Sequence, residues 1–394
     1  MKKIIALTIA VLALVSCKEA GVPMSMRMVR SEMARCQDAT YLDFCNGKIN
    51  WNYTPGLELK SFLDVYQAYG GEDILEYIDD WYELCIEDSG RITYYNSGAY
   101  TVDKTCPART LYQLYDVTGK EKYRFAIDSM MTRLSQHPRT SEGAFWHKTV
   151  YPYQIWLDGL YMAEPFYAEY VTRYAENKEE GYADILNDFI VAARHTYDPV
   201  TKLYRHAWDE THSMFWCDPE TGQSQHCWGR ALGWYCMAAV EVLDLIPEGT
   251  EGKQELVDIL RGIVAELPSW ADPESGMWYQ VLDQPGREGN YLEATCSAMF
   301  VYTMLRGIRS GYLDASLKDY AVKSYDALVD TFITEDENGL LSINGCCSVG
   351  GLGGSNNRMG DYAYYLSEPV RSNDPKGVGP FIWASLEIEK LKTK

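Results

Sequence analysis

Apolar residues recur along most of the chain with the period of an α-helix. Two well-separated segments carry the pattern with little interruption. They are residues 181–195, with Ile185, Phe189, Ile190 and Ala193 on one face, and residues 254–267, with Leu256, Leu260, Ile263 and Val264 on one face. The alternation of apolar and polar residues that is typical of strands is confined to a few residues at each turn. The pattern therefore predicts an all-α protein.

Short turn signals, each rich in Gly, Pro, Asp, Asn or Ser, divide the helical segments at intervals of roughly 50 to 75 residues. They occupy residues 89–92, 141–146, 198–204, 273–278 and 337–341. Regular spacing of this kind indicates a repeat architecture rather than independent domains. Helical hairpins joined in this way predict an (α/α)6 barrel, a six-hairpin toroid with short β-hairpins in its connecting loops. We expect one such domain over residues 46–394.

The N-terminal segment has the features of an export signal. A basic start, Met1-Lys2-Lys3, precedes a short apolar run that ends in Leu14-Val15-Ser16-Cys17, which resembles a bacterial lipobox. We expect residues 1–17 to be a lipoprotein signal peptide and Cys17 to be lipidated, with residues 18–45 forming a tether and a first helix. The protein would then be anchored in the bacterial cell envelope on the periplasmic side, touching the membrane only through its lipid.

Composition and charge narrow the possible partners. The chain has 394 residues, 46% of them hydrophobic, and a net charge of −20. This charge argues against nucleic-acid binding, since no basic stripe is present to replace counterions. An acidic ligand would need a local cluster of cations. The ten cysteines other than Cys17 show no zinc-ligand spacing, and their helical settings favour buried free thiols over a disulfide framework.

One carboxylate, Asp158, lies within an otherwise apolar and aromatic stretch at residues 154–166. Burial disfavours the charged form of a carboxyl group, and this is how proteins keep an acid able to donate a proton at neutral pH. The stretch alone is equally compatible with Asp158 capping a helix that begins at Gly159 or Leu160.

Other polar and aromatic residues fall in the segments that precede predicted inner helices, where the mouth of a toroid would lie. They are Tyr53, Asp103, His147, Lys148, His206, Trp228, Arg230 and Trp234. Each also has a structural interpretation: Asp103 as a second helix cap, the histidines and tryptophans as core residues, and Arg230 as the partner of a structural carboxylate. Their joint occurrence at equivalent positions favours a functional site.

Read in order, these positions form a series of motifs that spans residues 51–383. The series comprises Trp51-Asn52-Tyr53, Asp103, His147-Lys148, Asp158-Gly159-Leu160-Tyr161-Met162, His206, Trp228-Gly229-Arg230 with Gly233-Trp234, and Tyr364-Tyr365-Leu366-Ser367-Glu368-Pro369. It resembles glycoside hydrolase family 105, the unsaturated rhamnogalacturonyl hydrolases, which are related to the unsaturated glucuronyl hydrolases of family 88. The family fold is the (α/α)6 barrel. One difference is Ala231-Leu232 where the family commonly has Gly-Asn.

The resemblance implies an enzyme that acts on an acidic oligosaccharide whose non-reducing end is a 4,5-unsaturated uronic acid, as left by pectin lyases. Asp158 would be the general acid and base that hydrates the C4–C5 double bond, and Asp103 its helper, which would favour the protonated form of Asp158 by like-charge repulsion. The substrate would be bound by Arg230, His147, Lys148 and His206, with Tyr53, Trp228 and Trp234 as stacking faces. No metal and no organic cofactor is implied.

Three alternatives remain open at this stage. The sugar could differ, giving an unsaturated glucuronyl hydrolase that acts on other lyase products. The class could differ, giving a catalytically silent, lipid-anchored sugar-binding protein, although the retention of both Asp103 and Asp158 disfavours it. A sugar epimerase on the same toroid would need a central pair of histidines, and the chain has 6 histidines in all.

Overall fold

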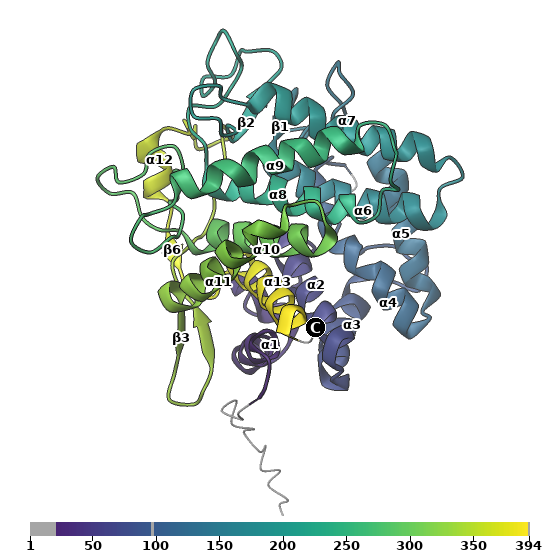
Figure 1. Cartoon of the computed structure of the whole chain (residues 1–394). Coiled ribbons are helices and arrows are strands. Elements are labelled where there is room, and N and C mark those ends of the chain that lie inside the picture. The colour runs from purple at the N-terminus through teal and green to yellow at the C-terminus, as the bar shows by residue number, and fades with distance from the viewer. Residues whose placement is uncertain (1–20, 96–97, 393–394) are drawn as a thin grey trace, which may run out of the picture.

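The computed structural model describes residues 21–95 and 98–392, so the predicted signal peptide and Cys17 lie outside the described residues. Helices dominate these ranges, as the apolar periodicity predicts (Figure 1). Their bounds are α1 Met24–Arg35, α2 Tyr53–Tyr69, α3 Glu72–Cys85, α4 Thr110–Thr118, α5 Glu121–Ser135, α6 Leu157–Tyr174, α7 Lys178–Thr196, α8 Gly229–Leu243, α9 Lys253–Trp270, α10 Ala294–Ser310, α11 Lys318–Phe332, α12 Tyr362–Ser367 and α13 Pro375–Lys392. Four short 3₁₀ turns complete the described helical structure, at Ala39–Phe44, Val102–Lys104, Cys106–Arg109 and Ala315–Leu317.

Alternate helices form an inner ring. Contacts run from α2 through α4 and its preceding 3₁₀ turn to α6, then to α8, α10 and α13, and α13 packs back against α2. The intervening helices α3, α5, α7, α9 and α11 lie outside them. The chain is therefore an (α/α)6 barrel, and the fold predicted from the repeats is confirmed.

Burial follows this division. Every residue of α8 is buried, as are residues 375–388 of α13, whereas the outer α7 and α9 bury only one face. A helix that is apolar all round needs protein on every side, whereas an amphipathic helix can face water. The sequence pattern thus sorts inner helices from outer ones.

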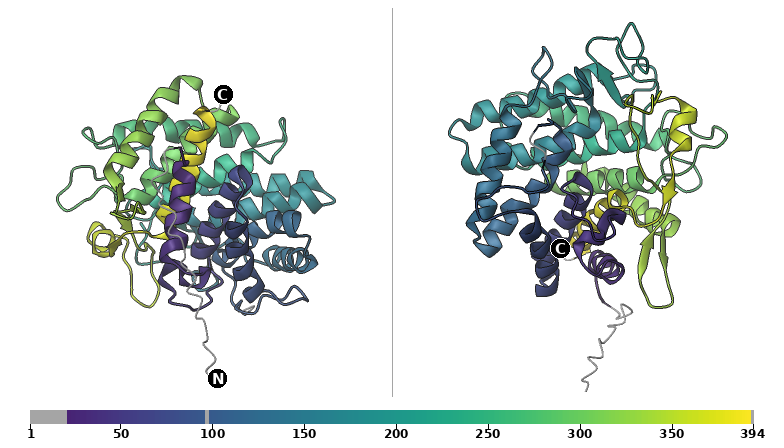
Figure 2. Two further views of the ribbon diagram at one scale, coloured as in Figure 1. Left: turned by 90° about the horizontal axis from the view of Figure 1, so that it is seen from below. Right: turned by 180° about the vertical axis from the view of Figure 1, so that it is seen from behind.

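The first helix is part of the packed domain. Helix α1 lies beside α13, which brings the two ends of the described chain together (Figure 2). The backbone N–H and the hydroxyl of Ser25 donate to Glu389 at 2.9 and 2.6 Å. The packed domain therefore begins at about Met24, earlier than the expected boundary at residue 46.

The described strands pair as three short antiparallel ladders, and only one is a hairpin. Strands β3 (Ile333–Glu335) and β4 (Leu341–Ile343) are joined by a tight turn, whereas β1 (Gln154–Trp156) pairs with β2 (Ala207–Asp209), and β5 (Cys346–Cys347) with β6 (Val370–Arg371). Isolated antiparallel bridges close the other turn signals, at Ile86–Ile92, Arg139–Phe145, Tyr197–Tyr204 and Ala271–Trp278, so the expectation of short hairpins in the connecting loops is confirmed. The β1–β2 and β5–β6 ladders are of a different kind. These two connect loops that are distant in sequence, which local patterning cannot reveal.

The ten cysteines of the described ranges are all free thiols, in agreement with the interpretation drawn from their helical settings. Within the same ranges, no helix is long and apolar enough to cross a membrane.

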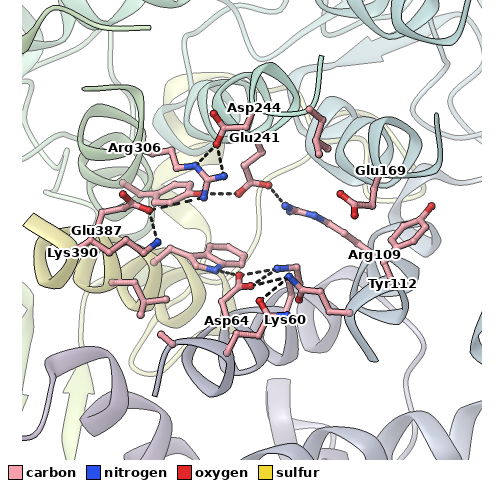
Figure 3. Close-up of a pocket in the computed structure, with 17 residues that line it drawn as sticks. Lys60, Asp64, Arg109, Tyr112, Glu169, Glu241, Asp244, Arg306, Glu387 and Lys390 are labelled. Carbon is pink, nitrogen blue, oxygen red and sulfur yellow. Dashed lines mark hydrogen bonds and ion pairs between the residues drawn. The ribbon is translucent and has the colours of Figure 1, made fainter. Parts of the chain in front are cut away.

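The end of the barrel formed by the C-terminal halves of the inner helices is lined with charged side chains. They come from five of the inner helices and, as Arg109, from the 3₁₀ turn before α4, and they converge on a cavity of about 400 Å³ (Figure 3). Lys60 contacts both carboxylate oxygens of Asp64 at 2.7 Å, and Arg109 pairs with Glu241. Every charged side chain labelled in Figure 3 has a partner of opposite charge. We interpret this network as the polar floor that joins the inner helices.

We expect Arg109→Met to lower the free energy of unfolding by about 2–3 kcal/mol, because it leaves a buried carboxylate without its cation. Arg109 and Glu241 are 16% and 4% exposed, so solvent screens the pair weakly. The urea midpoint measures the effect. Adding Glu241→Met should recover most of the loss. Arg91→Met, which breaks an exposed pair with Glu87, should change nothing measurable.

Candidate active site

The predicted site residues gather at the N-terminal ends of the inner helices, the end opposite the polar floor. Asp103 precedes α4, Asp158 lies in the first turn of α6, and Arg230 lies in the first turn of α8. Tyr53 begins α2. Because the inner helices run parallel to one another around the ring, residues at their starts meet at one mouth of the barrel.

Asp158 faces His206 because of the ladder between β1 and β2. Trp156 is paired with Ala207, and the N–H of Leu157 donates to the carbonyl of His206 at 3.1 Å. Asp158 directly follows Leu157, and its Oδ2 lies 3.2 Å from His206 Nε2. Asp158 is 9% exposed. One of its oxygens is thus held against an imidazole, while the carboxyl group keeps limited access to solvent.

The capping interpretation of Asp158 is wrong. Helix α6 begins at Leu157, earlier than Gly159 or Leu160, and its N-cap residue is Trp156. Asp158 accepts no capping hydrogen bond there, and its Oδ2 has no hydrogen bond from the described residues. Likewise the 3₁₀ turn that contains Asp103 has Thr101 as its N-cap. Neither carboxylate is used to start a helix.

Asp103 is enclosed by two neighbouring bases. Lys148 Nζ lies 2.6 Å from Asp103 Oδ2, and His147 Nε2 lies 3.6 Å from Asp103 Oδ1. An antiparallel bridge between Thr101 and Lys148 fixes the two loops against each other. Asp103 is 8% exposed and therefore depends on these partners for its charge.

The pKa shifts of Asp103, His147 and Lys148 indicate their protonation states. Burial by itself would raise the pKa of Asp103, but Lys148 and His147 outweigh it, and the pKa is lowered. Burial lowers the pKa of His147 to about 4, although the charge of Asp103 opposes the shift. Burial would lower the pKa of Lys148, yet the charge of Asp103 raises it. At neutral pH the group is thus a carboxylate, a neutral imidazole and an ammonium ion.

This arrangement corrects the role expected for Asp103. The sequence suggested that its charge would favour the protonated form of Asp158 by repulsion. Instead, the ammonium group of Lys148 offsets that charge at 2.6 Å. The two carboxyl groups differ in their charged neighbours. Asp103 is paired with a lysine, whereas among the described residues only His206 lies within ion-pair distance of Asp158.

Arg230 supplies a second cation. Its guanidinium lies 4.5 Å from the centre of the Trp228 ring, and its Nη1 donates to the carbonyl of Cys347. Its Nε is buried and has no hydrogen bond from the described residues. No carboxylate of the described chain lies within ion-pair distance of Arg230, so the structural pairing considered for it is absent there. Arg230 is therefore a buried cation without a carboxylate partner in the described chain.

Tyr53 and Trp234 lie deeper in the barrel. The Tyr53 ring meets the edge of Trp234 at 6.4 Å, and Trp234 packs against Tyr161 at 4.7 Å. Trp234 is 1% exposed. Its ring therefore supports the site from below and presents no open stacking face. Tyr53 is half-buried, and it lies close enough to Arg230 and Asp103 for both charges to act on its phenol group.

Several residues of the site carry no signal that singles them out in the sequence. Tyr365 OH lies 2.8 Å from His206 Nδ1, and Gln280 accepts from Trp228 Nε1 at 3.0 Å. Trp156 stacks on His147 at 4.6 Å with an interplanar angle of 9°. Tyr365 belongs to the C-terminal motif of the series, but its contact with His206 spans 159 positions. Only the folded chain pairs them.

The site holds carboxylates, imidazoles and cations, but no cluster of three or more His, Cys, Asp or Glu side chains suited to a metal ion is found among residues 21–95 and 98–392. What the geometry offers is acid–base chemistry: a carboxyl group beside an imidazole, a stable carboxylate beside a lysine, and an arginine with an unused donor.

The chain is similar to glycoside hydrolases in sequence and in structure. The model of the family described as Glycosyl Hydrolase Family 88 matches residues 24–392. The structure is similar to that of a Clostridium acetobutylicum (C. acetobutylicum ATCC 824) glycoside hydrolase from family 105, with 41% identity, a TM-score of 0.89, and coverage of 94% of this chain and 100% of that one.

Two further relatives are more distant. The unsaturated rhamnogalacturonyl hydrolase YesR of Bacillus subtilis (strain 168) is 29% identical over 301 residues, which cover 74% of this chain and 78% of YesR. An unsaturated glucuronyl hydrolase specific for heparin shares the fold, with 13% identity, a TM-score of 0.68, and coverage of 94% and 97% of the two chains.

A buried pair of carboxyl groups lies behind the site. Glu164 on α6 and Asp188 on α7 help to line a small cavity that also touches His147. Burial, and then the charge of Asp188, raises the pKa of Glu164 well above its usual value. Burial also raises the pKa of Asp188, to about 7, against the opposing charge of Arg139.

We expect this pair to make stability fall as pH rises. A carboxyl group with a raised pKa in the folded state holds a proton that the unfolded chain has released, so its contribution is lost between about pH 5 and 8. Glu164→Gln, which cannot ionise, should flatten that slope in urea unfolding measured across this range. Asp116→Asn on the surface should leave the slope unchanged. A slope that Glu164→Gln does not alter would contradict the prediction.

Proposed function

The chain belongs to glycosyl hydrolase family 88, and on this basis we propose that it removes the 4,5-unsaturated uronic acid from the non-reducing end of lyase-generated rhamnogalacturonan oligosaccharides. At the coarser level it is a glycoside hydrolase that acts on unsaturated uronides. Rhamnogalacturonan is favoured as the source because of the similarity to YesR, at 29% identity.

The observation that carries the mechanism is the contrast between the two carboxyl groups. Asp103 is paired with Lys148 at 2.6 Å and stays ionised, whereas Asp158 faces only His206 at 3.2 Å. Neighbouring carboxyl groups in unlike surroundings are suited to different roles in proton transfer. We therefore assign the acid to Asp158 and the fixed negative charge to Asp103.

The reaction is hydration of a vinyl ether. Asp158 donates its proton to C4, and positive charge develops at C5 and the ring oxygen. The resulting carboxylate then takes a proton from the water molecule whose oxygen bonds to C5. One residue can serve in both steps because they are sequential and require opposite protonation states. Asp103 would hold that water in line, with Lys148 keeping the carboxylate in place.

Cleavage of the glycosidic bond follows from the hydration. The product is a hemiketal at C5, whose ring opens to a C5 ketone and frees the former ring oxygen as a hydroxyl on C1. C1 then carries both this hydroxyl and the glycosidic oxygen, and it releases the next sugar as it becomes an aldehyde. Overall, one water molecule is consumed and no direct attack at C1 is needed, which distinguishes the scheme from ordinary glycosidases.

The carboxylate of the unsaturated sugar needs a cationic partner. Arg230 fits this role because its Nε is buried with no hydrogen bond from the described residues. A guanidinium can bind a carboxylate through two parallel hydrogen bonds. Trp228, on which Arg230 lies, would keep water away from the contact.

The test is the ultraviolet absorbance of an unsaturated rhamnogalacturonan disaccharide, which disappears when the conjugated double bond is hydrated. We expect the wild-type protein to abolish the absorbance and Asp158→Asn to be slower by about 10³-fold, the usual contribution of a general acid–base residue. Asp116→Asn should behave as wild type. Release of sugar with unchanged absorbance would refute the mechanism.

Activity confined to unsaturated glucuronyl disaccharides would refute the proposed substrate but retain the mechanism. Elimination makes both C4 and C5 planar, so unsaturated residues derived from galacturonic and glucuronic acid have the same ring substituents at these carbons. The two classes of substrate differ in their anomeric linkage and in the next sugar. A direct comparison of the two disaccharides therefore separates them.

Tyr365 is proposed as a positioning residue for His206. Its hydroxyl lies 2.8 Å from His206 Nδ1, and burial raises the pKa of this phenol, so it remains a donor. We assign the phenol as the donor to Nδ1, which leaves the ring proton on Nε2, 3.2 Å from Asp158 Oδ2.

We expect Tyr365→Phe to lower kcat by about 3- to 10-fold, the worth of one hydrogen bond, with little change in KM. The pH profile of kcat should shift, because His206 loses the partner that fixes its tautomer. Tyr325→Phe removes a comparable buried hydrogen bond, to Ser385, far from the site and serves as the control. A rise in KM alone would show that Tyr365 shapes binding instead.

A further inference from the structure

The loop that follows β5 covers one side of the active site. Gly350 packs so closely on Trp228 that a Cβ atom would lie 2.5 Å from the indole ring. The Tyr364 hydroxyl accepts a hydrogen bond from the N–H of Gly351 at 2.9 Å. A short turn follows, closed by a bridge between Gly353 and Arg358. The loop is therefore held against the site by its glycines, and it presents Arg358 at its far end.

Arg358 is fixed in place without a carboxylate. Its Nε donates to the carbonyl of Gly353 at 3.1 Å, and its Nη2 donates to the Tyr151 hydroxyl at 2.9 Å. In the described ranges no Asp or Glu lies within ion-pair distance of it, and its Nη1 has no hydrogen-bond partner. Like Arg230, Arg358 is therefore a held arginine with spare donors, in a chain with 56 acidic and 36 basic residues.

A row of stacked rings connects Arg358 to the catalytic centre. The Tyr151 ring stacks on Trp156 at 4.9 Å and 13°, and Trp156 stacks on His147 at 4.6 Å and 9°. Lys148 runs alongside, with its Nζ 5.8 Å from the centre of the Tyr151 ring. Cations thus line the route from Asp103 outward to Arg358. The contacts from Arg358 to His147 pass through the rings of Tyr151 and Trp156, so the guanidinium lies farther out than the groups that touch Asp103.

We propose that Arg358 forms an outer subsite that binds the carboxylate of a second uronic acid, located beyond the sugar next to the scissile bond. The proposal rests on the proposed function. In a backbone that alternates uronic acid with neutral sugar, the first carboxylate past the cleavage point belongs to the third residue. A planar guanidinium with free donors on one nitrogen suits that group. The unsaturated ring itself does little to distinguish one oligosaccharide from another, so the enzyme has to select its substrate by binding the sugars that follow.

The experiment compares two substrates on the same enzyme. One is an unsaturated disaccharide, which ends before the outer subsite, and the other is an unsaturated tetrasaccharide with an internal uronate. We expect Arg358→Gln to lower kcat/KM for the tetrasaccharide about 10-fold, mainly through KM, and to change it less than 2-fold for the disaccharide. Arg358→Lys keeps the charge but loses the planar guanidinium. Its kcat/KM for the tetrasaccharide should lie between those of the wild type and Arg358→Gln.

Arg133 offers a matched control, because it also binds a tyrosine hydroxyl (Tyr95, at 3.2 Å) and no carboxylate within ion-pair distance in the described chain. Arg133→Gln should leave both substrates unaffected. If Arg358→Gln lowers kcat/KM equally for both substrates, Arg358 only supports Tyr151. If it lowers kcat/KM for neither, Arg358 does not contact the oligosaccharide. Either result would overturn the proposal.

If wild-type protein hydrates neither substrate, the proposed function fails, and the subsite is then judged by calorimetric binding of a saturated tetrasaccharide. Binding that weakens with Arg358→Gln, and weakens with added salt in the wild type, would support the subsite. Binding that Arg358→Gln leaves unchanged would overturn it.

Discussion

The contact between the first and last inner helices is the constraint on which the rest of the molecule depends. Helix α13 lies against α2, where Gly379 packs on Leu57 and the Trp383 indole donates to Asp64 at 2.7 Å. These segments are separated by more than three hundred positions, so their contact closes almost the whole described chain into a ring. Closing the ring sets all inner helices side by side and brings their N-terminal ends to one mouth. The candidate site residues meet because of this geometry, although they come from separate hairpins.

At the mouth, pairing between strands and loops determines which side chains lie beside the two carboxyl groups. The ladder between β1 and β2 places Asp158 beside His206, and the bridge from Thr101 to Lys148 places an ammonium group on Asp103. Both carboxyl groups are largely buried, so the difference between them arises from their neighbours rather than from solvent. A low local dielectric makes the choice of neighbour decisive, because each ion pair is stronger there than in water.

Sequence reasoning recovered what local pattern encodes. Helices α7 and α9, the division into repeats and the unusual setting of Asp158 all depend on residues close together in the chain. It failed where pairing is distant: helix α6 begins earlier than expected because Trp156 is held in a ladder with a segment some fifty residues away. The partner of His206 could not be found either, since Tyr365 reaches it only through the loop after β5. Ala231 and Leu232, where the family commonly has Gly and Asn, both lie buried inside α8.

Buried polar atoms without partners show where the fold leaves room for a ligand. Folded proteins satisfy nearly all buried donors and acceptors, because each unmet group costs free energy. Several such atoms of the described chain lie at the mouth: Arg230 Nε and His147 Nδ1 have no hydrogen bond from protein, and Asp158 Oδ2 and His206 Nε2 lie 3.2 Å apart without a hydrogen bond. The charges of the polar floor, in contrast, are paired. Ion pairs are thus present at both ends of the barrel, but the mouth also buries Arg230, which pairs with no carboxylate of the described chain. Under the proposed function, this cation binds the carboxylate of the sugar.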